Sequence, residues 1–250
     1  MKKIIVRADD LGYSKGVNLG IEESVRNGII RSVGFMTNMP ESRNGYDLIK
    51  DLDVCLGQHT NICVGKPLCD PKDIPSLVDE KGEFKSSKTY RSAKEDFVDL
   101  DEVILEIEAQ YEKFKEITGK EPAYFEGHAV ASDNFFKGLQ IVANRHGLDY
   151  LGMSFDGTVP FRNQKVRMCM DSVNKEYDPT AFLKQIAEAE DEENTIPVMV
   201  CHPGYLDAYI LRTSSLLEPR ALEVEMATSS KVKRWLEDHD VQLITYDDLK

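Results

Sequence analysis

The strongest constraint on the fold of this chain is a pattern that recurs four times. A short apolar, strand-like run is followed at once by acidic or histidine side chains, at Asp9 and Asp10, at His59, at His128 and at His202. A run of this kind before turn residues is typical of a strand that opens a βα unit. Ligands of α/β folds bind beyond the carboxyl ends of the strands. If the four strands are parallel neighbours, two aspartates and three of the five histidines meet at one edge of the sheet.

The intervals between these runs carry helical periodicity. In the clearest interval, Asp99 and Glu102 have the spacing of a capping box, and Gly119 and Pro122 mark the end. Comparable patterns predict helices over about 15–27, 43–52, 136–146, 178–190, 218–227 and 230–239. Further strand-like segments are 33–36, 148–153, 166–170 and 241–246.

About seven strands therefore alternate with about seven helices, which favours an α/β fold over a sandwich or a bundle. We expect an irregular (β/α) barrel that forms a single domain over residues 1–250, a length that such barrels commonly reach. Residues 63–96 break the pattern with prolines and polar residues. Because a loop of this length is usually functional or mobile, we expect a lid or a substrate-contacting insertion at the same edge as His59.

Charge and composition limit the partners. A formal net charge of -13 and a pI of about 4.9 repel nucleic acid, anionic lipid and polyphosphate, so we expect no nucleic-acid and no membrane partner but a small substrate. No segment approaches the roughly 20 apolar residues of a membrane span, and the first apolar run is too short for a signal peptide. The five cysteines are odd in number and include no CxxC pair, which is typical of reduced thiols and a cytoplasmic location.

The chemistry of the four stations indicates a metal-assisted hydrolase. Asp10, His59 and His128 are residue types that hold a divalent ion and leave positions open for water and substrate. Successive strand residues point to opposite sides, so Asp9 is not expected to share the ion. At the end of a strand it can nevertheless approach the activated water, which makes it the candidate general base. His202 is the candidate acid for the leaving group, and hydrolysis of an amide or ester suits these parts. Each station alone is more often a cap, a turn or a structural histidine, and only their recurrence favours a site.

With these stations in view, the chain resembles the YdjC/ChbG-type carbohydrate deacetylases almost from end to end. The segments that carry the resemblance are 8–16, 56–59, 126–128 and 201–204, which read ADDLGYSKG, LGQH, EGH and CHPG. The resemblance implies an irregular barrel related to polysaccharide deacetylases, a divalent metal such as Mg or Zn, removal of N-acetyl groups from short amino-sugar oligomers, and a homodimer.

Carried over by position, the resemblance gives each station a role. It implies that Asp10, His59 and His128 are metal ligands, that Asp9 is the base and that His202 is the acid. Arg162 and Arg220 fall near basic positions of such enzymes, which makes them candidate contacts for a substrate hydroxyl or phosphate.

The third station departs from the family pattern, because a histidine-rich run is reduced here to His128 alone. Three other functions therefore stay open. The first is a hydrolase that cleaves a phosphorylated disaccharide such as cellobiose phosphate, although glycosidic cleavage normally uses two opposed carboxylates. The second is a non-catalytic sugar- or metal-binding relative. The third is a non-haem iron oxygenase, which the βα alternation disfavours.

Overall fold

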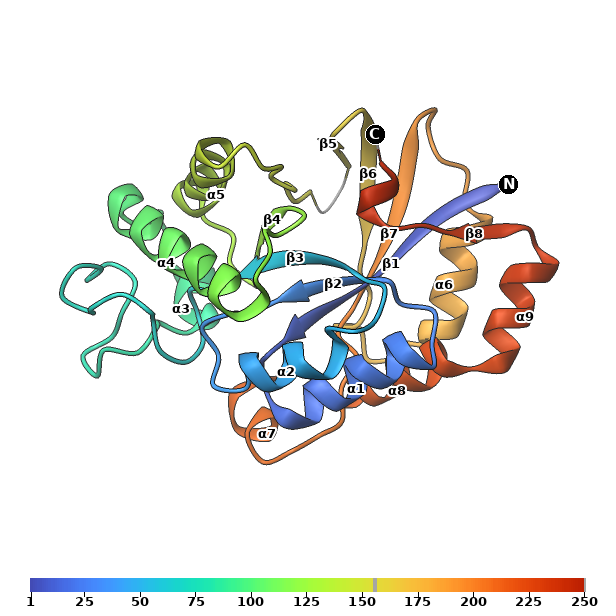
Figure 1. Ribbon diagram of the computed structural model, residues 1–250, viewed down its shortest axis with the longest axis horizontal. Helices are drawn as coiled ribbons and strands as arrows, with labels where there is room; N and C mark the ends of the chain where they lie inside the picture. The colour runs from blue at the N-terminus through green and yellow to red at the C-terminus, as the bar shows by residue number, and fades with distance from the viewer. Residues whose placement is uncertain (155–156, 250) are drawn as a thin grey trace.

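The strands form one curled sheet that leaves the barrel half open (Figure 1). The structure is a computed structural model, and it describes residues 1–154 and 157–249. The sheet order is β4-β3-β2-β1-β7-β6-β5, with β8 paired to the amino-terminal part of β1. The pairs are parallel except for β5 with β6. The strands are β1 (Lys2–Leu11), β2 (Ser32–Phe35), β3 (Cys55–Thr60), β4 (Phe125–Gly127), β5 (Thr158–Phe161), β6 (Gln164–Cys169), β7 (Thr195–Cys201) and β8 (Val241–Leu243). The predicted irregular α/β barrel is confirmed in this open form.

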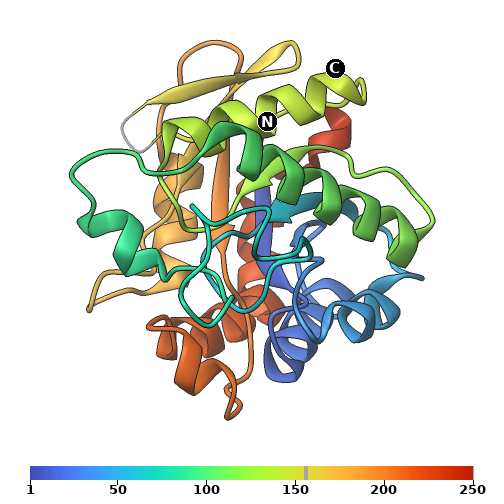
Figure 2. The same ribbon diagram turned by 90° about the vertical axis from the view of Figure 1, so that its left-hand side faces the viewer.

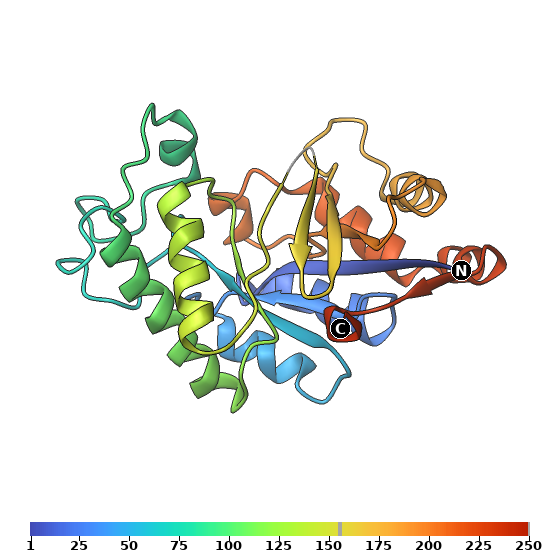
Figure 3. The ribbon, with the colours of Figure 1, turned by 90° about the horizontal axis from the view of Figure 1, so that it is seen from above.

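The helices flank the sheet and extend beyond its end. Helices α1, α2 and α8 lie along one face of the central strands, whereas α3, α4 and α5 gather where the arrows of β1 and β2 point, away from both termini (Figures 1 and 3). The helices are α1 (Lys15–Arg26), α2 (Ser42–Ile49), α3 (Ser87–Ser92), α4 (Leu100–Thr118), α5 (Asp133–Arg145), α6 (Pro179–Glu188), α7 (Ile210–Thr213), α8 (Glu218–Thr228) and α9 (Ser230–Asp238). Among the described residues, none of these helices combines the length and apolar character that crossing a lipid bilayer requires.

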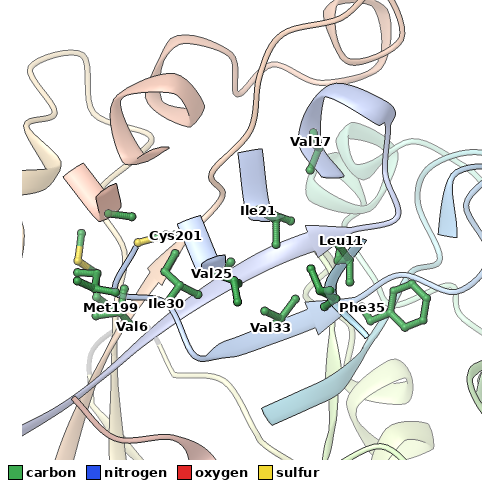
Figure 4. Packing of buried hydrophobic residues seen from close by; sticks show 14 of the residues in the cluster. Val6, Leu11, Val17, Ile21, Val25, Ile30, Val33, Phe35, Met199 and Cys201 are labelled. Atoms are coloured by element: carbon green, nitrogen blue, oxygen red, sulfur yellow. The ribbon is translucent and has the colours of Figure 1, made fainter. Parts of the chain in front are cut away.

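Strand β1 alternates between an apolar face and a polar one. Its even-numbered residues pack against α1 in a buried cluster, where side chains from both elements point toward each other (Figure 4). Members of this cluster include Ile4, Val6, Ala8, Val17, Ile21 and Val25. Because the side-chain period of a strand is two, Ile5, Arg7 and Asp9 face the concave side of the curled sheet. The same alternation that builds the core therefore carries charged groups into the half-barrel.

The segment between β3 and α4 is packed and anchored. It lies across the carboxyl ends of the strands (Figure 2) and contributes its own buried apolar residues beside α4 and α5. Glu106 of α4 accepts hydrogen bonds from the main-chain N–H groups of Leu68 and Cys69. Glu102, predicted to complete a capping box with Asp99, accepts instead from the Ser76 N–H at 2.6 Å. Asp99 still caps α4. One residue of the predicted capping box therefore caps the helix, and the other binds the loop.

The sheet edge differs from the prediction. Residues 148–153 form no strand and make only a single bridge, from Tyr150 to Phe125. The sheet gains β5 instead, which contains Pro160 and lies at the end of the strand order. Proline is tolerated at an edge, where its missing N–H removes no ladder hydrogen bond.

Candidate active site

Both aspartates at the end of β1 reach the same site because the strand is irregular there. The register with β2 shifts between Ala8 and Leu11, and Asp10 has a φ of 77°. An extra residue in a strand interrupts the alternation of faces, and such bulges are common beside active sites. Asp9 and Asp10 consequently both lie beside His59, although they belong to separate groups of possible metal ligands.

The structure brings the three predicted metal ligands together from β1, β3 and the residue that follows β4. Asp10 Oδ1 lies 3.1 Å from His128 Nδ1 and 3.5 Å from His59 Nε2, and the two ring nitrogens are 3.0 Å apart. All three side chains are largely withdrawn from solvent. Asp10 and His128, which are 118 positions apart in the chain, thus lie side by side.

These donors fit a divalent metal ion. Asp10 Oδ2 accepts from Arg220 Nη2 at 2.7 Å, whereas the buried Asp10 Oδ1 faces the two imidazoles. One available carboxylate oxygen and two imidazole nitrogens make an N₂O set of the kind that binds zinc, manganese, cobalt or iron. Asp10, His59 and His128 would hold the ion.

The pKa values of the three side chains favour positive charge at this site, which a bound cation would supply in place of protons. Burial would lower the pKa of His59, but Asp9 and Glu126 outweigh it and raise the pKa to about 10. Burial likewise opposes the charge of His128, and Asp10 with Cys63 raises its pKa to about 9. Burial would raise the pKa of Asp10, yet His128 and Arg220 hold it well below its usual range. A metal must displace protons from such imidazoles, so its binding releases protons.

Asp9 belongs to a second, adjacent cluster that contains Arg7 and Glu126. Arg7 donates from Nη2 to Asp9 Oδ2 at 2.7 Å, and its Nη1 lies 2.5 Å from Glu126 Oε2. The opposite oxygens are also buried. Asp9 Oδ1 has no hydrogen-bond partner in residues 1–154 and 157–249, and Glu126 Oε1 lies 3.4 Å from His59 Nδ1. A Cβ atom placed on Gly34 would lie 2.8 Å and 2.9 Å from these two oxygens. Glycine at this position of β2 therefore makes room for the carboxylates.

His202 and Arg220 complete the site from β7 and α8. His202 follows β7, and burial lowers the pKa of its imidazole to about 4, although Asp10 and Asp9 favour the charged ring. Its Nδ1 is buried and lacks a hydrogen-bond partner within the described chain. Arg220 is 2% exposed and is engaged by Asp10. Arg220 thus contacts a candidate metal ligand, and its contact with a substrate stays a prediction.

Arg162 does not lie at the site, and we withdraw it as a substrate contact. Its guanidinium forms an ion pair with Asp149 at 2.7 Å and donates to the main-chain oxygens of Ala123, Tyr246 and Leu249. Ala123 precedes β4, whereas His128 follows it, so Arg162 lies toward the opposite end of the strands. It holds the carboxyl-terminal segment against the sheet.

Sequence reasoning missed three residues of the site, Arg7, Gly34 and Glu126. Two of them carry a recognisable pattern, because Arg7 is two positions before Asp9 and Glu126 is two positions before His128. Residues at this spacing share one face of a strand. Gly34 has no such signal, since only the fold shows which carboxylates approach it.

The half-barrel and its donor set define an α/β-barrel protein with a candidate divalent-metal site at the carboxyl-terminal edge of the sheet. The family model described as YdjC-like protein matches residues 3–238, and the chain belongs to this family.

Relatives and solved structures agree with that placement. A chitooligosaccharide deacetylase of Yersinia enterocolitica is 31% identical over 99% of this chain and 99% of its own length. A protein of Enterococcus faecalis V583, provisionally named a cellobiose-phosphate cleavage protein, matches with a TM-score of 0.85 and 23% identity over 99% and 98% of the two chains. A peptidoglycan N-acetylglucosamine deacetylase has the same fold, with a TM-score of 0.53 and 12% identity over 99% of this chain and 87% of the other. The predicted relation to polysaccharide deacetylases is confirmed at the level of the fold.

Proposed function

We propose that the protein is a metal-dependent hydrolase that removes N-acetyl groups from small amino-sugar oligosaccharides. The observation that supports it best is the convergence of Asp10, His59 and His128 beside Asp9, a carboxylate held separately. The name of the Yersinia relative and the membership in the YdjC-like family point to the same chemical class.

A bound divalent ion would act as a Lewis acid toward the acyl oxygen and lower the pKa of water. Because its N₂O donor set contains two imidazoles, and magnesium prefers oxygen ligands, zinc fits Asp10, His59 and His128 better. This narrows the expectation of Mg or Zn to zinc.

Asp9 is suited to take a proton from the attacking water. Burial and the nearby Glu126 raise its pKa above the usual range for aspartate, although Arg7 opposes this. A base with a pKa closer to neutrality accepts a proton more effectively. Arg7 holds Oδ2, which leaves Oδ1 as the atom that receives the proton.

His202 is suited to return a proton to the leaving nitrogen. Its ring is neutral at pH 7, because burial lowers its pKa to about 4. The proton that Asp9 removes from water therefore passes to the His202 ring as negative charge develops nearby, and the ring then gives it to the amine as the bond from carbon to nitrogen breaks. Asp9→Asn separates the two roles, because it removes the base and leaves His202 in place.

The test is release of acetate from N,N′-diacetylchitobiose and longer oligomers, followed together with free phosphate and monosaccharide from cellobiose phosphate. We expect acetate from the former, no product from the latter, loss of activity with a chelator, and recovery with zinc. Free phosphate or glucose would favour the phosphodisaccharide alternative instead. That alternative fits the site less well, because glycosidic cleavage normally uses two carboxylates on opposite sides of the scissile bond, whereas Arg7 holds Asp9 and Glu126 side by side. Sugar binding without any product would support the non-catalytic alternative.

We also infer from the family resemblance that residues 1–250 act as a single domain in a cytoplasmic homodimer. Light scattering coupled to size-exclusion chromatography tests the assembly. A mass of one chain, 28.3 kDa, would contradict it.

A further inference from the structure

The main chain of His202 is held on both sides by one turn of α8. Arg220 Nη1 donates to the His202 carbonyl oxygen at 3.2 Å, and the His202 N–H donates to Glu223 Oε2 at 2.5 Å. β7 ends at Cys201, so His202 is the first residue beyond the sheet. Side chains of a helix thus satisfy the peptide groups that a strand ladder no longer serves.

The two α8 side chains that hold His202, Arg220 and Glu223, are hydrogen-bonded and hidden from solvent. Arg220 is 2% and Glu223 is 0% exposed, and residues three positions apart share one face of a helix. Arg220 also donates to Asp10 and to the Leu216 carbonyl oxygen, and Glu223 Oε1 accepts from the Tyr177 hydroxyl at 2.9 Å. One helix turn therefore sets the position of His202 relative to Asp10.

The ring of His202 depends on this main-chain support. Its Nδ1 has no hydrogen-bond partner among the described residues, so that atom does not fix the ring. Pro203 restricts His202 to extended backbone, which fixes its conformation but not its distance from Asp10. The distance is fixed by the groups that contact both residues, and Arg220 contacts both.

We propose that Glu223 is a positioning residue for His202, acting with Arg220 to place the imidazole over the site. The inference rests on the proposed function, in which His202 exchanges a proton with the leaving group. Proton transfer is sensitive to displacement, since a shift of about 1 Å can cost on the order of 100-fold in rate. Glu223 would thus control turnover without contacting substrate or metal.

The test compares Glu223→Ala, Glu223→Gln and Glu225→Ala. We expect Glu223→Ala to lower kcat about 10- to 100-fold while KM and zinc content stay unchanged. Glu223→Gln keeps an oxygen that can accept from the His202 N–H, so it should recover most of kcat. Glu225→Ala is the matched control, because Glu225 is an exposed residue of the same helix. Equal losses in Glu223→Ala and Glu223→Gln would overturn the proposal.

A double-mutant cycle with His202→Ala separates positioning from general destabilisation. If Glu223 acts through His202, Glu223→Ala has no further effect on the residual acetate release of His202→Ala. The same fold-loss in both backgrounds would show that Glu223 acts through stability and would overturn the proposal.

Amide hydrogen exchange at residue 202, followed by NMR, gives a readout independent of activity. Exchange should accelerate in Glu223→Ala and stay unchanged in Glu225→Ala. Unchanged exchange in Glu223→Ala would contradict the proposal that Glu223 holds the main chain of His202. Full acetate release by His202→Ala would instead show that the proposed role of His202 is wrong. The exchange rate would still decide whether Glu223 holds that residue.

Discussion

Asp9 and Asp10 are neighbours in the chain, equally buried, and each is bound by an arginine at 2.7 Å, yet their electrostatics are opposite. Burial, the largest effect on both, raises the pKa of Asp9, whereas His128 and Arg220 overcome it and hold the pKa of Asp10 well below its usual range. Two identical side chains therefore differ in pKa because their charged neighbours differ.

The difference lies in how the positive charge is shared. Within the described part of the chain, Arg220 forms an ion pair only with Asp10, and two imidazoles lie beside the same carboxylate. Arg7 divides its charge between Asp9 and Glu126. Asp10, which faces an arginine and two imidazoles, stays ionised, as a candidate metal ligand should, whereas Asp9 and Glu126 share one arginine and the pKa of Asp9 is the one that rises.

Substitution of each aspartate by asparagine should give the largest and clearest contrast. Asp9→Asn should lower kcat by about 100- to 10,000-fold, the usual contribution of a general base, with zinc content unchanged. Asp10→Asn should lose both zinc and activity, because one of three ligands becomes a weaker donor. Metal analysis beside acetate release checks both. Zinc loss in Asp9→Asn would show that the two roles are exchanged or shared.

Removal of each arginine should lower the free energy of unfolding by a different amount. Arg7→Met leaves Asp9 and Glu126 uncompensated in the interior, and breaking a buried pair in this way costs about 3–5 kcal/mol of unfolding free energy. Arg220→Met should cost less, because His59 and His128 still face Asp10. Urea denaturation of both variants measures the difference. Arg7→Met combined with Glu126→Gln should recover part of the loss, and no recovery would argue against charge sharing.

A methyl group on Gly34 should crowd Asp9 and Glu126 most closely and the Cβ of His59, at 3.2 Å, less closely. The added Cβ would meet Asp9 Oδ1 and Glu126 Oε1 at less than 3.0 Å, and such overpacking costs about 1–3 kcal/mol. Gly152→Ala is the control, because its Cβ would meet neighbours only at 3.8 Å or beyond. Thermal unfolding compares the two variants. A neutral Gly34→Ala would show that the carboxylates move freely, against the geometry described here.

The sequence predicted the candidate metal ligands of this site better than the groups that change their pKa values. Asp10, His59 and His128 each follow an apolar run, and topology alone brings the ends of parallel strands together. Arg7 lies inside such a run, where a charged residue is more often a solvent-facing position. Only the curl of the sheet makes that face an interior.

Arg162 and Arg220 illustrate the same limit, since both were candidates for one role. Arg220 lies on α8, which returns to the site after β7, whereas Arg162 lies beyond the opposite ends of the strands. The sequence pattern of residues 63–96 likewise predicted where this loop lies but not the hydrogen bonds that anchor it. Its anchors are Glu102 and Glu106, which the helical pattern of α4 assigned to that helix alone.

The contrast is also tested by the pH dependence of stability without metal, where the two aspartates are expected to differ only in which histidine each affects. The pKa values of His59 and His128 are raised to about 10 and about 9, so the stability they contribute is complete below about 6.5 and is lost as the pH rises toward 9–10. Urea melts in a chelator at pH 6.5, 8 and 9.5 should show this decline. Asp10→Asn should flatten the part due to His128, and Asp9→Asn the part due to His59, because those carboxylates are the strongest groups that favour each charged ring. Identical slopes in the two variants would mean that Asp9 and Asp10 act on the histidines as one undivided charge.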